Sequence, residues 1–442
     1  MGQAFVQPAL LVPSIAFLAF VSAIAHAGCS AVEQDPWSQR EACDGREDGA
    51  GGGYGPETGE SKHHGVSPIV DEASLRLFSL SHTLPRIDLT VSEASEAALR
   101  ADPRTYVAAR FEFADSKGRV GPLEIGVRAK GRAGSYRSFD KKMAFKLDFN
   151  RLERGQKLFG LGKLNLNNMV QDPSGVREWL SYRIFGNQGV PVPRTGYARV
   201  YVNKVEFGVY LTLESTDDAG FLKRHFPSTS VLYEGGYGQD LFAGSEAEFE
   251  EDAGADPERI ALRRLTNLLA QASAQDAYES LAVAVHWDEV IAAMATELFV
   301  GHGDGYALAR NNYFLHFDGD GRVSLIPWGT DKTLTRARGL KEGSGLLFSA
   351  CVGDSDCRRA YGFALGRVSR NAKEFLATDV EELRGLGARL AREMATESRS
   401  RHDPGLVRTR VEETIGFLES QISDVEALLG CPNDKHAAAY AD

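Results

Sequence analysis

Apolar and polar residues alternate in the first half of the chain and recur at helical spacing in the second half. Alternation typical of half-buried strands is seen at 84–91, 106–113, 120–128, 143–149, 198–202 and 207–214. Turn residues separate several of these runs, for example Asp115-Ser116-Lys117-Gly118 and Asn203-Lys204. The pattern therefore predicts a strand-rich first part.

Helices are predicted at 92–100, 175–185, 217–226, 258–274, 276–300 and 358–395. Ser92 is a suitable N-cap for the first of them. The last predicted helix, 406–429, has apolar residues on one face, namely Ile415, Leu418, Ile422, Val425 and Leu429. This face is expected to contribute to the core. The segment 235–257 is acidic and Gly-rich, and we expect a surface loop there.

The first 67 residues have a different composition. Residues 9–25 are almost wholly apolar and precede Ala25-His26-Ala27, a small-x-small cleavage pattern, so 1–27 is predicted to be a signal peptide although its start has no Lys or Arg. Gly28-Cys29 also resembles a lipoprotein site, where Cys29 would provide a membrane tether, but His26 stands where an aliphatic residue is usual. Simple export is thus favoured over lipidation, and the protein is expected to be secreted, periplasmic or on the cell surface.

Residues 28–67 are Gly-rich and poor in apolar residues, which predicts a flexible linker. His63-His64 in this segment is better explained as solvated tail than as a metal site. The folded domain is expected to span 68–430. The 442 residues suffice for one large domain or two ordinary ones, and the net charge of −11 argues against a general nucleic-acid binder.

Five cysteines agree with export. The spacer in Cys351-Val-Gly-Asp-Ser-Asp-Cys357 is short and turn-rich, which favours a local disulfide in an oxidising compartment. Cys43 and Cys431 then remain as a candidate second pair, with free thiols as the alternative. A zinc site is not expected, because no CxxC or HxxxH pattern accompanies the cysteines.

Acidic and amide side chains follow apolar segments between 302 and 331. Asp304 follows a helix-like run, Asn311 and Asn312 precede a strand-like run at 313–317, and Asp331 follows another at 322–327. These elements can bring Asp304, an Asn and Asp331 to one end of a sheet. Such oxygen ligands suit a divalent metal and a phosphate, although each residue alone is also an ordinary turn residue.

A basic, Gly-containing loop lies between two predicted strands. The strands and loop carry Arg128, Lys130, Lys142 and Lys146, and Gly131 and Gly134 supply accessible backbone N–H groups. This combination suits polyphosphate, but it has no Walker pattern, and Lys on a strand is usually solvated. Glu214 ends a strongly apolar strand, where it is either an edge residue or a buried partner for a phosphate-binding Lys.

These blocks together resemble the CotH kinase family from about 84 to 429. The first block is Arg128-Ala129-Lys130-Gly131-Arg132 with Ser138-Phe139-Asp140-Lys141-Lys142 and Phe145-Lys146-Leu147. The second is the run from Val200 to Tyr210 with Glu214. The third is Asp304-Gly305-Tyr306, Asn311-Asn312-Tyr313-Phe314-Leu315 and Ile326-Pro327-Trp328-Gly329-Thr330-Asp331. Their shared order along the chain makes the resemblance specific.

The resemblance implies an α+β, atypical protein-kinase-like fold with two lobes. A β-rich N-terminal lobe would span about 84–213 and a mostly helical C-terminal lobe about 214–430. It also implies ATP, Mg²⁺ or Mn²⁺, and transfer of the γ-phosphate to Ser or Thr of an extracytoplasmic or surface protein. Asp304 would orient or deprotonate the acceptor hydroxyl, and Asn312 (or Asn311) and Asp331 would hold metal. Lys142 or Lys146 would contact the phosphates, near Arg128, Lys130 and Glu214.

One position departs from the family pattern. Gly329 stands where the family often has a carboxylate, which removes a second metal ligand, and the spacing from Asp304 to Asn312 is longer than the commoner one. The alternatives to a kinase are therefore a catalytically inactive surface, coat or binding protein, and a nucleotide-binding enzyme with a different transfer reaction.

Overall fold

Seven strands close into a barrel in the computed structural model of this protein, which describes residues 36–44, 71–80, 83–132, 134–399 and 402–431. The signal-peptide prediction, Cys29 and His63-His64 lie outside the described residues. The barrel order is β1-β2-β3-β4-β5-β7-β6, and a parallel pairing of β1 with β6 closes it. The strands are β1 (Arg86–Val91), β2 (Val107–Asp115), β3 (Gly118–Lys130), β4 (Ala144–Asp148), β5 (Lys163–Asn167), β6 (Thr195–Val202) and β7 (Val205–Glu214).

The barrel has its own apolar core, because the alternating residues point inward. Phe111 and Phe113 of β2 and Phe145 of β4 are almost completely buried there. On β3, Val127 and Ala129 are buried, whereas Arg128 and Lys130 are only partly covered. The period of two thus places both cationic residues on the outer face of the barrel.

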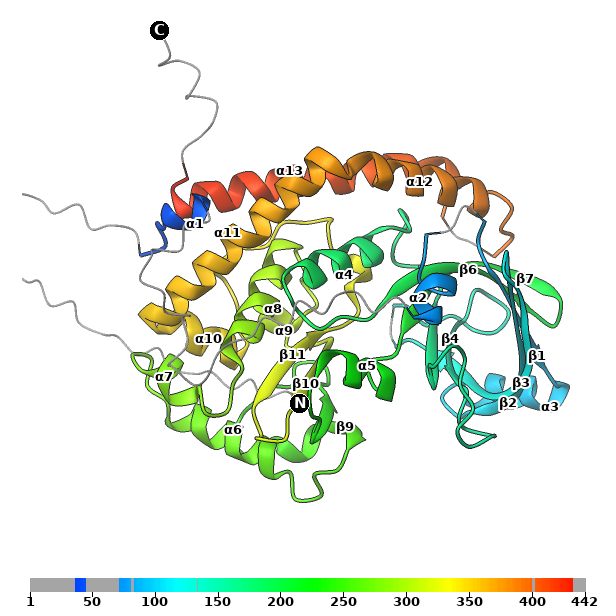
Figure 1. The fold of residues 1–442 in the computed structure, drawn as a ribbon, viewed down its shortest axis with the longest axis horizontal. Helices are drawn as coiled ribbons and strands as arrows, with labels where there is room; N and C mark the ends of the chain where they lie inside the picture. The colour runs from blue at the N-terminus through cyan, green and yellow to red at the C-terminus, as the bar shows by residue number, and fades with distance from the viewer. Residues whose placement is uncertain (1–35, 45–70, 81–82, 133, 400–401, 432–442) are drawn as a thin grey trace, which may run out of the picture. The chain divides into compact units, whose positions relative to one another are not determined.

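The remainder combines a second sheet with helices (Figure 1). The sheet has the antiparallel order β11-β10-β8-β9. Its strands are β8 (Val231–Glu234), β9 (Glu250–Gly254), β10 (Tyr313–Phe317) and β11 (Val323–Pro327). The helices are α1 (Glu41–Asp44), α2 (Glu72–Arg76), α3 (Glu93–Ala101), α4 (Arg177–Asn187), α5 (Ala219–His225), α6 (Ile260–Gln271), α7 (Ala277–Leu281), α8 (Trp287–Phe299), α9 (Tyr306–Ala309), α10 (Leu346–Gly353), α11 (Ser355–Thr378), α12 (Val380–Met394) and α13 (Val407–Leu429), with short 3-10 turns η1 (Glu246–Glu248), η2 (Thr330–Lys332) and η3 (Pro404–Leu406).

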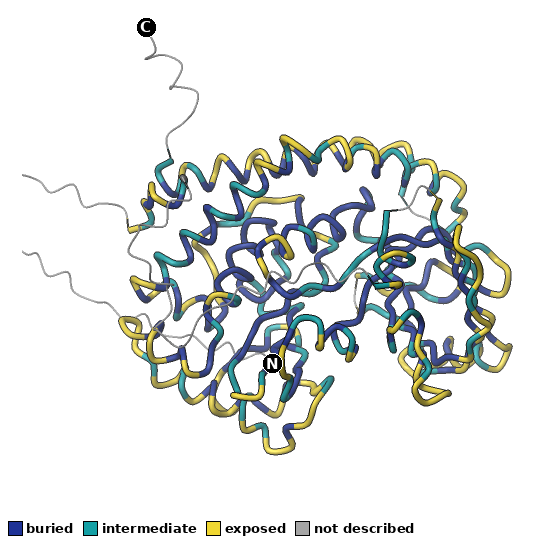
Figure 2. The backbone as a smooth tube through the Cα atoms, viewed as in Figure 1, coloured by how far each residue is buried: buried dark blue, intermediate teal, exposed yellow. Residues whose placement is uncertain are grey.

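Helix α8 lies at the centre of the larger apolar core. All of its residues except Asp288 and Glu289 are buried, and it packs against β11 and α11. Helices α12 and α13 cover this core from outside, so Figure 2 shows exposed and buried residues alternating along them. The predicted inner face of the last helix is confirmed, since Ile415, Leu418, Ile422, Val425 and Leu429 are all buried.

The mixed α+β class is confirmed, and the kinase-like two-lobe arrangement stays a prediction. Three local predictions were wrong. The segment 28–67 is not entirely linker, because its residues 41–44 form α1 and Ala42 is completely buried in the larger apolar core. Residues 276–300 are not one helix, because His286 N donates to the Val323 carbonyl and the chain there pairs with β11 before α8 begins. The acidic segment 235–257 is not entirely loop, since Glu250–Gly254 forms the edge strand β9, whose solvent-facing positions accept charged residues.

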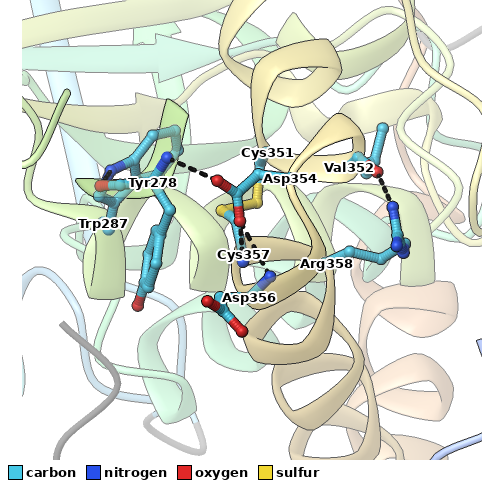
Figure 3. The surroundings of a disulfide bond; sticks show 8 residues. All are labelled: Tyr278, Trp287, Cys351, Val352, Asp354, Asp356, Cys357 and Arg358. Carbon is cyan, nitrogen blue, oxygen red and sulfur yellow. Dashed lines mark hydrogen bonds between the residues drawn. A yellow bond between two sulfur atoms is a disulfide. The ribbon is translucent and has the colours of Figure 1, made fainter. Parts of the chain in front are cut away.

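Both cysteine pairs are disulfides. Cys351 and Cys357 join the end of α10 to the first turn of α11. Figure 3 shows how Asp354 holds this corner: its carboxylate accepts from the backbone N–H groups of Asp356, Cys357 and Tyr278. Cys43 and Cys431 join α1 to the end of α13 across a sequence separation of 388 residues.

We expect loss of the long-range disulfide to lower stability. Replacing Cys43 and Cys431 by Ser should reduce the free energy of unfolding by about 2–5 kcal/mol, since the crosslink restricts the unfolded chain over a very long loop. Urea unfolding followed by circular dichroism measures this. The matched control is the Cys351→Ser, Cys357→Ser variant, whose sequence separation of 6 predicts a smaller loss. A larger loss in the control would contradict the argument.

Candidate functional site

A partly buried chain of hydrogen bonds connects the barrel to helix α4. Lys130 at the end of β3 donates from Nζ to Asn167 Oδ1 at 2.7 Å. Asn167 at the end of β5 donates from Nδ2 to Glu178 Oε2 at 2.6 Å. Glu178 is in the first turn of α4 and only 2% exposed. The Asn167 amide therefore bridges a cation and a carboxylate on three different elements.

Asp331 belongs to the same electrostatic group. Burial raises the pKa of Glu178, and the charge of Asp331 raises this pKa further. Burial also raises the pKa of Asp331, while Lys130 opposes the shift. Burial lowers the pKa of Lys130, and the charges of Glu178 and Asp331 oppose that shift. Glu178, Asp331 and Lys130 thus influence one another's protonation, and burial disfavours the charged form of each of the three groups.

Asp304 lies in a second polar cluster, in the loop that follows α8. Its side chain is 37% exposed, and its Oδ2 is 3.9 Å from Lys332 Nζ. Asn311 Nδ2 donates to Asp304 Oδ1 at 3.1 Å, and Asn312 Nδ2 donates to the Asp304 carbonyl at 3.0 Å. Both asparagines therefore position the Asp304 loop, and the carboxylate keeps access to solvent.

The segment from Trp328 to Lys332 joins the two clusters. Lys130 Nζ lies 5.0 Å from the centroid of the Trp328 ring, and Trp328 N donates to the Asn312 carbonyl at 2.9 Å. Gly329 has a φ of +60°, and a Cβ there would lie 2.9 Å from Asn312 Cγ. A glycine at 329 therefore leaves room for the Asn312 amide, which takes up the space where a carboxylate side chain would begin.

Glu297 fixes both ends of the Asp304 loop and was not among the predicted site residues. Its main-chain carbonyl accepts from His302 N at 2.9 Å. Its carboxylate accepts from Tyr306 N and, at 2.9 Å, from Ala307 N. Glu297 is 2% exposed, and burial raises its pKa to about 8. Gly305 is required beside it, because a Cβ there would overlap Glu297 Oε1.

Two other predicted site residues, both lysines, have partners outside these clusters. Lys142 is buried and donates from Nζ to Glu397 Oε2 at 2.7 Å. Lys146 donates to Asp217 Oδ2 at 3.2 Å. Burial alone would raise the pKa of Asp217. The charges of Lys146 and Lys163 instead hold this pKa at about 2. Of Lys130, Lys142 and Lys146, it is Lys130 whose charge acts on the pKa of Asp331.

Glu214 is completely buried between two arginines. Arg194 donates to both of its carboxylate oxygens, at 3.0 and 3.2 Å, and Arg224 also pairs with both. Burial would raise the pKa of Glu214, but Arg224 and Arg194 lower it below its usual value. Its observed partners are thus arginines, and the alternative of a phosphate-binding Lys partner is not seen.

The donor groups suit a hard divalent cation of the Mg²⁺ type. Within the described residues no three His, Cys, Asp or Glu side chains gather as metal ligands. Mg²⁺ commonly takes only one or two carboxylates and completes its shell with phosphate oxygens and water. Asp331 and Asn312 supply a carboxylate and an amide oxygen, and Glu178 Oε1 is a buried oxygen with no hydrogen-bond partner. These residues fit such an ion if phosphate oxygens complete the shell.

Comparison with known proteins places this region in a recognised sequence group. Residues 127–362 match the family described as CotH kinase protein, which is more than half of the 442 residues. The inner spore coat protein H of Bacillus subtilis (strain 168) is 26% identical over 229 residues, which cover 49% of this chain and 61% of that protein. The family match begins on β3 and ends in α11, so it includes Lys130, Glu178, Asp304 and Asp331.

No helix among the described residues has the length and apolar character needed to cross a membrane.

Proposed function

This chain belongs to the CotH kinase protein family, and on that basis we propose that it is an exported, ATP-dependent kinase acting on Ser or Thr of extracytoplasmic or surface proteins. The observation that carries the proposal is the coupling of Lys130, Asn167 and Glu178 with Asp331, beside the loop of Asp304 and Asn312. Phosphoryl transfer needs positive charge at the phosphates and a positioned acid–base group at the acceptor, and these residues supply both.

Each residue has a defined task in this proposal. Lys130 binds the phosphates, and Glu178 keeps Lys130 oriented through Asn167. Asp331 and Asn312 hold the divalent cation, which when bound neutralises charge on the phosphoryl oxygens. Asp304 accepts a hydrogen bond from the acceptor hydroxyl and takes its proton as the hydroxyl oxygen bonds to the γ-phosphorus. The bond between that phosphorus and the β,γ-bridging oxygen breaks in the same step, and ADP leaves. Its 37% exposed carboxylate is accessible to a protein substrate.

The two disulfides are consistent with an exported or surface protein.

One observation favours a second candidate function, a non-catalytic coat or binding protein. The Asn312 amide packs against Gly329, so a carboxylate cannot be added at 329 without moving Asn312. A single acidic metal ligand then remains in the Trp328–Asp331 segment, and the relative quoted above is named as a spore coat protein.

The test is incubation of the mature protein with ATP labelled on the γ-phosphate, or on the α-phosphate, with Mg²⁺ or Mn²⁺. A kinase incorporates only the γ-label into protein and adds the mass of one phosphate per site. Incorporation of the α-label with the mass of a nucleotide would establish nucleotidyl transfer instead. Absence of either label, with correctly folded protein and several acceptor proteins, would favour the non-catalytic alternative.

We expect Glu297→Gln to slow transfer without weakening nucleotide binding. The amide can accept from only one of Tyr306 N and Ala307 N, so the Asp304 loop loses one of its fixed points. A displaced acid–base group should lower kcat by about 10- to 100-fold while KM for ATP stays unchanged. Initial rates over a range of ATP concentrations measure both constants. Glu289→Gln, two turns earlier on α8, is the control. A parallel change in KM would show that Glu297 acts elsewhere.

A further inference from the structure

Two adjoining surface pockets lie beside the basic loop between β3 and β4. The first has a volume of about 310 Å³ and is lined by Pro103, Arg104, Arg128, Ala129, Gly131, Arg132, Gly134 and Tyr136. The second has a volume of about 350 Å³ and is lined by Tyr136, Arg137, Ser138 and Lys141. Tyr136 lines both pockets and is 37% exposed, so an aromatic ring separates them at the surface.

The lining is cationic in an otherwise acidic protein. Four arginines and one lysine line the two pockets, and neither lining includes Asp or Glu, although the chain carries 61 acidic and 50 basic residues. This accumulation of one sign of charge leaves the pockets electrostatically unbalanced. Arginine offers a planar fork of donors that matches a phosphate or carboxylate group.

The guanidinium groups are largely available for a ligand. In the part of the chain that the structure describes, Arg104 and Arg128 have no carboxylate within 4.0 Å. Arg128 donates to the Ala129 carbonyl and lies 5.2 Å from the centre of the Tyr106 ring. Arg132 has one distant partner, Glu250 at 4.0 Å, and both of these side chains are more than half exposed. The neighbouring acid Asp102 bonds to the backbone N of Arg104 and to the Thr105 hydroxyl.

The loop itself is braced in this shape. Arg137 donates from Nη1 to the carbonyls of Gly134 and Tyr136, at 2.8 and 2.7 Å. Gly131 has a φ of +102°, and a Cβ there would lie 2.8 Å from Ser135 Oγ. The main chain therefore bends at Gly131, between Arg128 and Arg132, and a side chain at 131 would not fit beside Ser135.

We propose that the first pocket binds a phosphoserine side chain of a protein, with Arg104, Arg128 and Arg132 as its ligands. The adjoining pocket and the Tyr136 ring would receive the next residues of the same extended peptide. The inference rests on the proposed function for the source of the phosphoserine, which would be a product of earlier transfer. A kinase that holds its product in this way would act preferentially on segments that already carry a phosphate.

The pockets are distinct from the proposed transfer site. Their linings include none of Lys130, Asn167, Glu178, Asp304 and Asp331. Lys130 follows Arg128 on the same face of β3 but directs its ammonium group to Asn167. The charged groups available to a phosphate in the first pocket would thus be arginines, at a place different from the proposed transfer site. In this proposal Arg128 binds the phosphoserine, whereas the sequence analysis expected Arg128 to lie near the phosphates of the nucleotide.

The experiment measures binding by fluorescence anisotropy, without any turnover. The probes are a fluorescein-labelled peptide with one phosphoserine and the same peptide with unmodified serine. We expect the phosphorylated probe to bind at least about tenfold more tightly, because charge-assisted bonds to arginine are strong. Arg104→Ala and Arg128→Ala should each remove most of this preference. The matched control is Arg154→Ala, an exposed arginine that lines neither pocket.

Competition with ATP separates the two sources of phosphate. If ATP without metal leaves the peptide bound, the pocket is a separate site, as we propose. Complete displacement of the peptide from the wild-type protein by ATP would assign the pocket to the nucleotide and overturn the inference. Equal affinity for both probes would also overturn it. Because binding is read without transfer, a protein that binds the phosphorylated probe but incorporates no label would refute only the proposed function.

Discussion

Asp304→Asn should lower kcat for transfer to protein by about 10²–10⁴-fold, with little change in KM for ATP. The amide cannot take the proton of the acceptor hydroxyl, but it keeps the shape of the side chain and can still bond to Asn311. Asp331→Asn should instead raise the metal concentration needed for half-maximal rate, because Asp331 is proposed as the cation ligand. Rates at a series of Mn²⁺ and ATP concentrations separate the two effects.

The control for both substitutions is Asp320→Asn, in the exposed turn between β10 and β11. It should behave as wild type. Equal incorporation of label by wild type, Asp304→Asn and Asp331→Asn would refute both assigned roles. Loss of activity together with loss of folded protein, measured by circular dichroism, would make the substitutions uninformative about chemistry, so the melting temperature of each variant belongs to the experiment.

The same site predicts how activity depends on pH. Burial raises the pKa of Asp331 above that of an exposed aspartate, and Lys130 limits the rise. The metal ligand is the deprotonated form, so kcat/KM should increase as pH rises through this elevated pKa. The acid limb should therefore lie at a higher pH than an ordinary Asp would give. Lys130→Met removes the opposing charge and should move the limb to still higher pH, in addition to lowering activity.

Glu214→Gln should produce the largest loss of stability. Glu214 is completely buried, and its substitution leaves Arg194 and Arg224 without their shared carboxylate. Removing one member of a buried ionic group costs about 3–5 kcal/mol. Urea unfolding at neutral pH measures the loss, and Glu112→Gln on the barrel surface is the control. Unchanged stability with weaker nucleotide binding would restore a role for Glu214 at the phosphates.

The pH dependence of this loss has a definite sign. Arg224 and Arg194 lower the pKa of Glu214 despite its burial. A carboxyl group whose folded pKa is depressed contributes stability above its unfolded pKa, and this contribution is lost as pH falls through the folded pKa. The difference between wild type and Glu214→Gln should therefore be largest near neutral pH and should shrink in acid.

The sequence predicted the elements better than the partners. Strand alternation correctly predicted a strand over 120–128, because the period of two depends on local geometry alone. The structure extends this strand to Lys130, which the sequence analysis had placed in the basic loop. The prediction that Asp304 and Asn312 lie together agrees with the hydrogen bond between them. These residues are only eight positions apart, and the short helix and turn between them leave few other arrangements.

Long-range partners could not be predicted in this way. Lys142 and Lys146 carry the same charge and are four positions apart, yet Lys142 pairs with Glu397, 255 residues away, and Lys146 pairs with Asp217. The sequence did not identify Glu178 as a site residue. One acidic residue in the first turn of a helix is most simply explained as a favourable charge at the helix N-terminus. Only the packing of α4 against the barrel turns Glu178 toward Asn167 and Lys130.

The disulfide between Cys43 and Cys431 makes residues 43 to 431 a covalent ring. A protease that cuts this ring once produces two pieces of backbone that stay attached through sulfur. In an oxidising environment such a nicked molecule would keep its mass, and its core could stay assembled. The cut would become visible only after reduction, as two fragments on a denaturing gel. Damage by proteases would thus require two cuts between Cys43 and Cys431 before a fragment from this ring is released.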